Sequence, residues 1–197
     1  MRLLFVDACV RGSASRTRKL ADVFLKTFQA ANPDAVIETV DLPTLNLMPY
    51  NEAMLAERER LIDSGAFDDA VFDLARQFAM ADCVLIAAPY WDFSFPAMLK
   101  TYIEHIFTRL ITFVYDESGP IALGKPTRAV YLTTAGSGIQ GANFGGDYLK
   151  YSLGILGIGQ FYQVSAENLD IIGSDVDAIM ACAMESSRSL ALRFGIK

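Results

Sequence analysis

The sequence Asp7-Ala8-Cys9-Val10-Arg11-Gly12-Ser13-Ala14-Ser15-Arg16-Thr17-Arg18-Lys19 lies between two apolar patterns of different period. Residues 3–6 before it are continuously apolar, as in a strand buried within a sheet, so residues 2–7 are predicted to be a strand. Leu20, Phe24 and Phe28 after it recur at helical spacing, so residues 15–31 are predicted to be a helix. The quoted stretch is therefore a turn that leads from a strand into a helix.

This turn is basic and rich in hydroxyl groups. No Asp or Glu occurs between Asp7 and Asp22, although the chain as a whole is acidic. The start of a helix offers unpaired backbone N–H groups and the positive end of the helix dipole. The side chains that accompany these groups, and with them predict a phosphate-binding turn, are Arg11, Ser15, Arg16, Thr17 and Arg18. The alternative is an ordinary helix start with Ser13 or Ser15 as its N-cap.

The composition limits the class of protein. With 197 residues, 52% of them hydrophobic, the chain can bury a core, and we expect a single domain over residues 1–197. The net charge of −6 argues against nucleic acid as a partner, which leaves the basic turn to a small anionic ligand. The apolar runs are too short for a signal peptide or a membrane span. The three cysteines are far apart and suit neither a metal site nor a disulfide framework, so we expect a cytoplasmic protein.

The rest of the chain alternates between strand and helix patterns. Further strands are predicted at residues 36–42, 82–88, 127–134 and 161–166. Further helices are predicted at residues 51–62, 68–79, 96–110, 148–156 and 174–194, the last of them capped by Ser174. This alternation predicts an α/β fold with a five-stranded parallel sheet, strand order 2-1-3-4-5 and helices on both faces.

Three further features allow a weaker interpretation. The predicted loop 43–50 contains four large apolar residues, which either pack on the core or line a pocket or an interface: Leu45, Leu47, Met48 and Tyr50. Residues 112–115 and 119–120 are predicted to be a short extended excursion with a turn. His105, the single histidine, falls on the polar side of its predicted helix without a suitably spaced carboxylate or cysteine, so we expect a surface residue.

The predicted topology brings three unusual turns together. In such a sheet, ligands bind beyond the carboxyl ends of the strands where the strand order reverses, so the turns after the first, third and fourth strands meet there. The second of these turns, Tyr90-Trp91-Asp92-Phe93, offers aromatic faces to a flat ring, although core packing is the alternative. The third, residues 133–138, offers flexible backbone with free N–H groups. A phosphate site beside a site for a planar ring predicts FMN as the ligand.

Taken in order, these turns resemble those of the flavodoxin-like FMN-dependent NAD(P)H oxidoreductases, in particular the azoreductase/quinone reductase (acyl carrier protein phosphodiesterase-like) group. The resemblance spans nearly the whole chain. It is carried by residues 13–19, by residues 89–93 with the following Pro96-Ala97-Met98-Leu99-Lys100, by residues 112–115 with Gly119-Pro120, and by residues 133–137.

The resemblance implies a flavodoxin-like fold and a homodimer with an FMN near each subunit junction. It implies that NADH or NADPH donates a hydride and that a quinone, azo or nitro compound accepts two electrons. Since one aromatic-lined face serves donor and acceptor in turn, we expect a ping-pong mechanism with no catalytic side chain and no metal. The implied cofactor-binding residues are Arg11, Ser15, Arg16 and Thr17 at the phosphate, Pro89, Tyr90, Trp91, Asp92 and Phe93 at the isoalloxazine ring, and Thr134, Ala135, Gly136 and Ser137 at its pyrimidine end.

The chain departs from the family pattern in all three turns. Cys9 stands where members often have Ser, the middle turn more usually reads Met-Tyr-Asn-Phe, and the third turn often carries an Arg and paired glycines. Two other functions remain open: a flavin-binding electron carrier without NAD(P)H turnover, and a phosphatase with Cys9 as nucleophile. Against the phosphatase, Cys9 and Arg16 are one residue farther apart than in the thiolate loop of small tyrosine phosphatases.

Overall fold

A parallel sheet of five strands, in the order β2-β1-β3-β6-β7, forms the centre of the molecule in the computed structural model, which describes residues 1–139 and 141–195. The strands are β1 (Arg2–Asp7), β2 (Val36–Asp41), β3 (Cys83–Ala87), β6 (Arg128–Thr134) and β7 (Gln160–Ala166). The parallel sheet and the predicted strand β1 are thereby confirmed. The missing numbers belong to a separate antiparallel hairpin of β4 (Phe113–Asp116) and β5 (Gly119–Ala122), at the predicted extended excursion. The expected order 2-1-3-4-5 numbered only the strands of the central sheet, whereas the hairpin strands β4 and β5 are included in the numbering used here.

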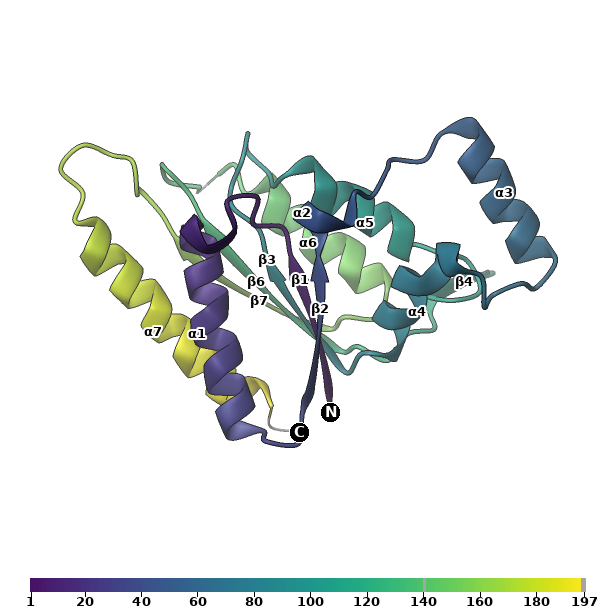
Figure 1. Cartoon of the computed structure of the whole chain (residues 1–197), viewed down its shortest axis with the longest axis horizontal. Coiled ribbons are helices and arrows are strands. Elements are labelled where there is room, and N and C mark those ends of the chain that lie inside the picture. The colour runs from purple at the N-terminus through teal and green to yellow at the C-terminus, as the bar shows by residue number, and fades with distance from the viewer. Residues whose placement is uncertain (140, 196–197) are drawn as a thin grey trace.

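Helices cover both faces of this sheet (Figure 1). On one face lie α1 (Arg16–Ala31) and α7 (Val176–Phe194), and on the other lie α4 (Asp73–Met80), α5 (Ala97–Ile106) and α6 (Phe144–Ile155). Successive side chains of a strand point to opposite faces, so Leu3 and Phe5 pack with the α1–α7 layer whereas Leu4 and Val6 pack with the opposite layer. A continuous apolar strand is thus explained by a core on each side.

The remaining helices lie in the chain between β2 and α4. The short helix α2 (Leu42–Leu45) occupies part of the segment that the sequence predicted to be a loop, and the prediction was wrong there. Helix α3 (Glu52–Asp63) stands at the edge of the molecule (Figure 1). Residues 68–79, predicted as one helix, divide into a 3-10 turn (Ala70–Phe72) and α4, because the Asp69 side chain accepts from the N–H of Val71 and starts the 3-10 turn there.

The helix α5 ends earlier than predicted, and Leu110 lies outside it with a φ of 69°. Its last carbonyl groups have partners outside the helix: the Thr112 hydroxyl donates to the carbonyl of Ile106 at 2.6 Å, and the guanidinium of Arg58 donates to that of Phe107. Helix α7 begins at Val176, capped by Asp175 and not by Ser174, because the Asp175 carboxylate accepts from the N–H of Ala178 at 3.0 Å. Among the described residues, no helix is long and apolar enough to span a membrane.

His105 is buried, which corrects the prediction of a surface residue. Its polar side of α5 is covered by the loop that follows α2, a contact that helical periodicity cannot show. The ring of Tyr50 stacks on the imidazole with centroids 4.3 Å apart, and Nε2 lies 2.9 Å from the carbonyl oxygen of Met48. Because that carbonyl can only accept, Nε2 carries the proton, and Nδ1 accepts from the Tyr50 hydroxyl at 3.2 Å. Met48 itself remains exposed.

Candidate functional site

A cavity of about 440 Å3 lies at the carboxyl ends of β1, β3 and β6, where the strand order reverses. Its lining comes from all three turns that the sequence singled out. The predicted site residues that line it are Arg11, Ser15, Arg16, Pro89, Tyr90, Trp91, Thr134, Ala135 and Gly136. The volume falls within the range of about 300–1,000 Å3 found for small-molecule sites.

The turn after β1 presents the start of α1 to this cavity. Ser15 is the N-cap, and its hydroxyl accepts from the N–H of Arg18 at 3.3 Å, as one of the two predicted caps requires. In the part of the chain that the structure describes, the N–H groups of Arg16 and Thr17 have no hydrogen-bond partner. The predicted helix start is therefore capped and still keeps donors for an anion.

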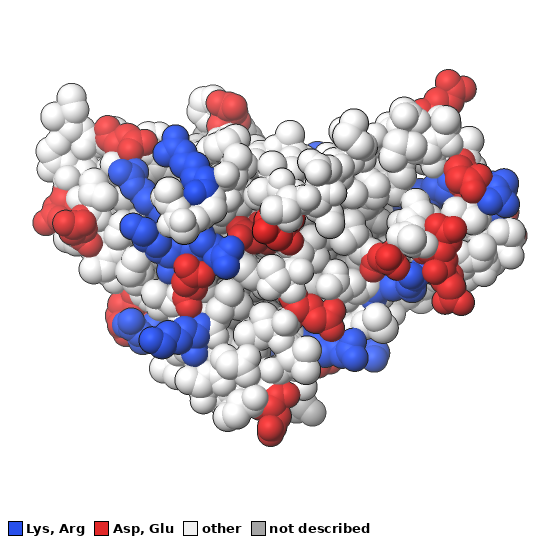
Figure 2. Space-filling view, in the orientation of Figure 1, with Lys and Arg blue, Asp and Glu red and all other residues white. Residues whose placement is uncertain are grey.

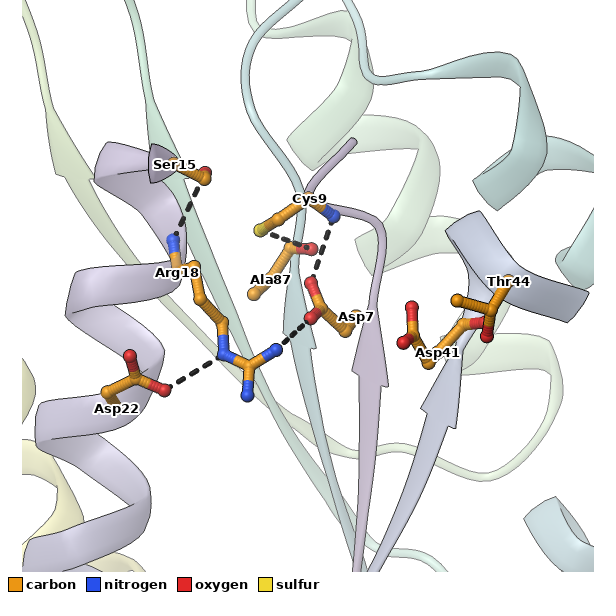
Figure 3. Close-up of polar contacts among 8 residues, drawn as sticks. All are labelled: Asp7, Cys9, Ser15, Arg18, Asp22, Asp41, Thr44 and Ala87. Atoms are coloured by element: carbon orange, nitrogen blue, oxygen red, sulfur yellow. Dashed lines mark hydrogen bonds and ion pairs between the residues drawn. The ribbon is translucent and has the colours of Figure 1, made fainter. Parts of the chain in front are cut away.

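Arg18 does not line the cavity, although the sequence placed it in the phosphate turn. Figure 3 shows its side chain between Asp7 and Asp22. Its guanidinium pairs with Asp7, the last residue of β1, and donates to Asp22 at 2.9 Å. Asp7 is buried and also accepts from the N–H of Cys9 at 2.9 Å. Arg18 is thus a structural partner of Asp7, and their ion pair links the end of β1 to the first turn of α1.

Cys9 does not have the chemistry of a nucleophile. Its side chain is buried, and the thiol lies 3.6 Å from the carbonyl oxygen of Ala87, to which it donates. Burial raises the pKa of the Cys9 thiol far above its usual value, and the neighbouring Asp7 carboxylate raises it further. A thiol that remains protonated cannot attack a phosphate ester, so the geometry does not support the phosphatase alternative.

The turn after β3 places aromatic residues beside the cavity. Trp91 pairs with Ser94 through two backbone hydrogen bonds of 3.2 and 2.8 Å, which close a tight turn. Asp92 and Phe93 at its centre have φ values of 48° and 66°, in the left-handed region that bulky side chains rarely adopt. Both side chains lie outside the cavity, and Phe93 is 61% exposed. Trp91 and Phe93 are both exposed, so neither packs in the core, which was the alternative interpretation of this turn.

The turn after β6 supplies backbone donors. Among the described residues, the N–H groups of Gly136, Ser137 and Gly138 have no hydrogen-bond partner, whereas that of Ala135 donates to Ala166 at 2.9 Å. Ser137 is exposed and its side chain does not line the cavity. Gln140, in the glycine-rich stretch that follows, lies outside the described residues.

Thr17 and Thr134 tie two of these turns together beneath the cavity. Their hydroxyl oxygens are 2.7 Å apart, and both side chains are buried. The side chain of Thr17 therefore serves to join α1 to β6, and among the atoms of Thr17 only the backbone N–H is left for a ligand. This contact links the start of α1 to the end of β6.

Comparison with known proteins agrees with this geometry. Residues 1–190 match the family described as having the flavodoxin-like fold. The chain belongs to this family. Among its relatives, the FMN-dependent NADH:quinone oxidoreductase 2 of Clostridium acetobutylicum is 34% identical and the FMN-dependent NADH:quinone oxidoreductase of Clostridium perfringens 33% identical, each over 98% of this chain and 99% of the relative. The resemblance inferred from the turns is confirmed.

Several solved structures share the fold of the chain. An azoreductase from Bacillus anthracis superposes with a TM-score of 0.88 at 22% identity, covering 98% of this chain and all of that one. An FMN-dependent NADH-azoreductase from the same species, solved in complex with FMN, superposes with a TM-score of 0.87 at 20% identity, covering 98% of each chain. At this level of identity the comparison establishes the fold alone.

Four cavity residues were not predicted from the sequence: Val10, Ala14, Leu169 and Asp170. Val10 and Ala14 lie within the quoted turn, where small and apolar residues gave no sign of a contact. Leu169 and Asp170 follow β7, whose exit was not expected to reach the site. Their backbone N–H groups donate to Ala135 at 3.1 Å and to Gly136 at 3.0 Å, so this loop runs along the turn after β6. A fourth segment of the chain thus contributes to the site of this family member.

Basic side chains gather over α1 and the turn that precedes it (Figure 2). Because the net charge of the chain is −6, this concentration is local. Arg11 and Arg16 bring guanidinium groups to the cavity, while Asp170 brings a carboxylate. The electrostatics favour an anion at one end of the cavity only, beside the start of α1.

Proposed function

We propose that this chain is an FMN-dependent NAD(P)H oxidoreductase that reduces quinones and azo compounds by two electrons. The observation that carries the proposal is the meeting, at one cavity, of a helix start with free N–H groups, an aromatic turn and a turn with free backbone donors. The names of the relatives support FMN, NADH and quinones, and those of the structural neighbours support azo compounds.

The donors present suit FMN. The N–H groups of Arg16 and Thr17, which have no partner among the described residues, and the guanidinium groups of Arg11 and Arg16 would hold the phosphate. Tyr90 and Trp91 would lie against the isoalloxazine ring, and the Tyr90 hydroxyl is fixed by donation to the carbonyl of Ala142 at 2.8 Å. The cavity offers one turn that could bind a phosphate, which suits FMN better than the pyrophosphate of FAD.

The contribution of the chain to the reaction is binding and electrostatics. When bound, FMN would supply the redox chemistry, namely hydride transfer from NADH or NADPH and two-electron reduction of an acceptor. The free N–H groups of Gly136 and Ser137 would donate to the pyrimidine end of the ring and stabilise the negative charge that reduction places there. Donor and acceptor would use the same aromatic-lined cavity in turn, which supports a ping-pong mechanism.

The proposed assembly is a homodimer in the reducing cytoplasm. Large apolar side chains remain exposed at the end of α2, in the loop after it and in the β4–β5 hairpin, namely Leu45, Met48, Tyr115 and Ile121. A second copy that packs on this surface would bury them and place each cavity near the subunit junction. The three cysteines are free, as proteins of a reducing compartment usually keep them.

The proposal is tested by the spectrum and the kinetics of the purified protein. We expect a flavin absorption spectrum and a released cofactor with the mass of FMN. In anaerobic stopped-flow experiments, NADH or NADPH should bleach the flavin within the turnover time, and a quinone should restore it. A flavin that NAD(P)H does not bleach would identify an electron carrier, and a protein that binds no flavin would refute the proposal.

The acceptor and the mechanism require steady-state data. Initial rates with NADH and a quinone should give parallel double-reciprocal lines, because the donor leaves before the acceptor binds. Intersecting lines would show that both bind together. Light scattering at micromolar concentration should give twice the mass of the 197-residue chain.

A further inference from the structure

Asp170 is held over the cavity by contacts with two of the three turns. The N–H of Asp170 donates to the carbonyl of Gly136 at 3.0 Å, and its carboxylate accepts from Nη1 of Arg16 at 2.9 Å. Asp170 therefore joins the loop after β7 to the start of α1, across the end of the cavity where an anion is expected.

Gly136 leaves the space that this carboxylate occupies. A Cβ atom at position 136 would lie 2.5 Å from Oδ2 of Asp170, closer than Cβ atoms approach other atoms. Gly136 has an ordinary φ, so the glycine is not required there by the conformation of the backbone. The absence of a side chain at position 136 instead allows the Asp170 side chain to lie against the turn and reach Arg16.

The ion pair neutralises one of the two arginines that line the cavity. Arg16 and Asp170 are 42% and 71% exposed, so water screens the pair and little free energy opposes its separation. The contrast with Arg18 is informative, since its partner Asp7 is 3% exposed and cannot be displaced by a ligand. Arg16 is thus the arginine of this turn that can exchange one anionic partner for another.

We propose that Asp170 competes with the phosphate of the cofactor for Arg16, and so sets the affinity for FMN and the preference for the phosphorylated flavin. This inference rests on the proposed function. Before FMN binds, the carboxylate holds the Arg16 side chain at the edge of the cavity; when the phosphate arrives, Arg16 transfers to it and Asp170 turns to solvent. The exchange reduces the net gain from the charge-assisted bond between Arg16 and the phosphate.

The test is titration of the full-length protein, stripped of flavin, with FMN and with riboflavin, followed by the quenching of flavin fluorescence. Asp170→Asn keeps the shape of the side chain and removes its charge. We expect FMN to bind about two- to fivefold more tightly, the range that exposed ion pairs reach, and riboflavin to bind as before. The matched control is Asp177→Asn, which removes the same charge from an exposed position on α7 and should change neither affinity.

A second pair of variants shows whether Asp170 acts through Arg16. In an Arg16→Ala background, Asp170→Asn should no longer tighten FMN, since there is no arginine to release. Three results would overturn the inference: unchanged or weaker FMN binding in Asp170→Asn, an equal gain for riboflavin, or a gain that persists without Arg16. If the unmutated protein bound no FMN, the proposed function would fail instead, so the two failures are distinguishable.

Discussion

Asp7 and Asp41 end neighbouring strands in the same register, yet their surroundings are opposite (Figure 3). Asp7 is buried and holds both the N–H of Cys9 and the guanidinium of Arg18. Asp41 is exposed, and its carboxylate makes no hydrogen bond to the start of α2. One carboxylate fixes the turn that leads into α1, whereas the other leaves its loop to be held by contacts farther along the chain.

The difference lies in the elements that pack above each strand end. Helix α1 lies directly beyond β1 and supplies a cation to Asp7. The loop beyond β2 is instead held by His105 of α5, through the ring of Tyr50 and the carbonyl of Met48. The turn into α1 is thus supported by a buried ion pair, whereas the loop after α2 is supported by a stacked pair of rings and the hydrogen bonds of His105.

The largest expected effect is the difference in stability between variants of Asp7 and of Asp41. Asp7→Ala leaves the Cys9 N–H without its acceptor and leaves Arg18 with Asp22 alone. It should lower the free energy of unfolding by about 2–3 kcal/mol, less than for a fully buried pair because Arg18 is one-third exposed. Asp41→Ala should change it by less than about 0.5 kcal/mol. Urea denaturation measures both. Equal effects would show that the burial of Asp7 does not matter.

The next effect concerns the cofactor. Arg16→Ala removes a charge-assisted bond to the phosphate worth about 1.5–3 kcal/mol, so FMN should bind roughly ten- to a hundredfold more weakly. Arg16→Glu should bind still more weakly, because it also sets a carboxylate against the phosphate. Lys19→Ala, at an exposed position on the same helix, is the control. Full retention of FMN by Arg16→Glu would contradict the assignment of the turn.

The support of the second loop should depend on pH. Burial lowers the pKa of His105 from its usual 6.5. The hydrogen bond to the Met48 carbonyl opposes this shift, the charge of Arg58 lowers the pKa further, and Glu104 opposes it least. The unfolded chain then binds more protons than the folded one. The His105 contribution is therefore complete above about pH 6.5 and is lost as the pH falls through the folded-state pKa.

Two variants at position 105 separate stacking from titration. His105→Ala should lower the free energy of unfolding by about 1–2 kcal/mol at neutral pH, through loss of the stacked ring and its hydrogen bonds. His105→Phe keeps a ring against Tyr50 and cannot titrate, so this component of the acid destabilisation should disappear. Denaturation curves between pH 7 and pH 5 measure it. An unchanged pH profile in His105→Phe would exclude His105 as the titrating group.

The sequence predicts best where structure follows from local patterns. Strand β1 and the start of α1 were predicted to within one residue, because a run of buried apolar residues and a serine cap identify them directly. The meeting of three turns followed from topology alone, since parallel strands of this order place their carboxyl ends together.

What the sequence could not show are contacts between distant segments. His105 was assigned to the surface because its side of α5 is polar, and only the fold brings the Met48 loop over it. Arg18 was assigned to the phosphate turn as one of its basic residues. The sequence does not show that its side chain pairs with Asp7, at the other end of that turn. Asp170 carries no motif, and it reaches Arg16 only because β7 ends beside β6.

The smallest expected effect tests whether Cys9, whose N–H donates to Asp7, has a chemical role or only a packing role. Cys9→Ser keeps a donor for the carbonyl of Ala87 and nearly the same volume, so the free energy of unfolding should fall by less than about 1.5 kcal/mol. Flavin content and quinone reduction should be unchanged, as in the exposed control Cys182→Ser. A nucleophilic cysteine would behave differently, since a serine here has no base to activate it and activity would be abolished. Loss of quinone reduction with flavin still bound would therefore assign a chemical role to Cys9, and the buried, protonated thiol argues that this will not be observed.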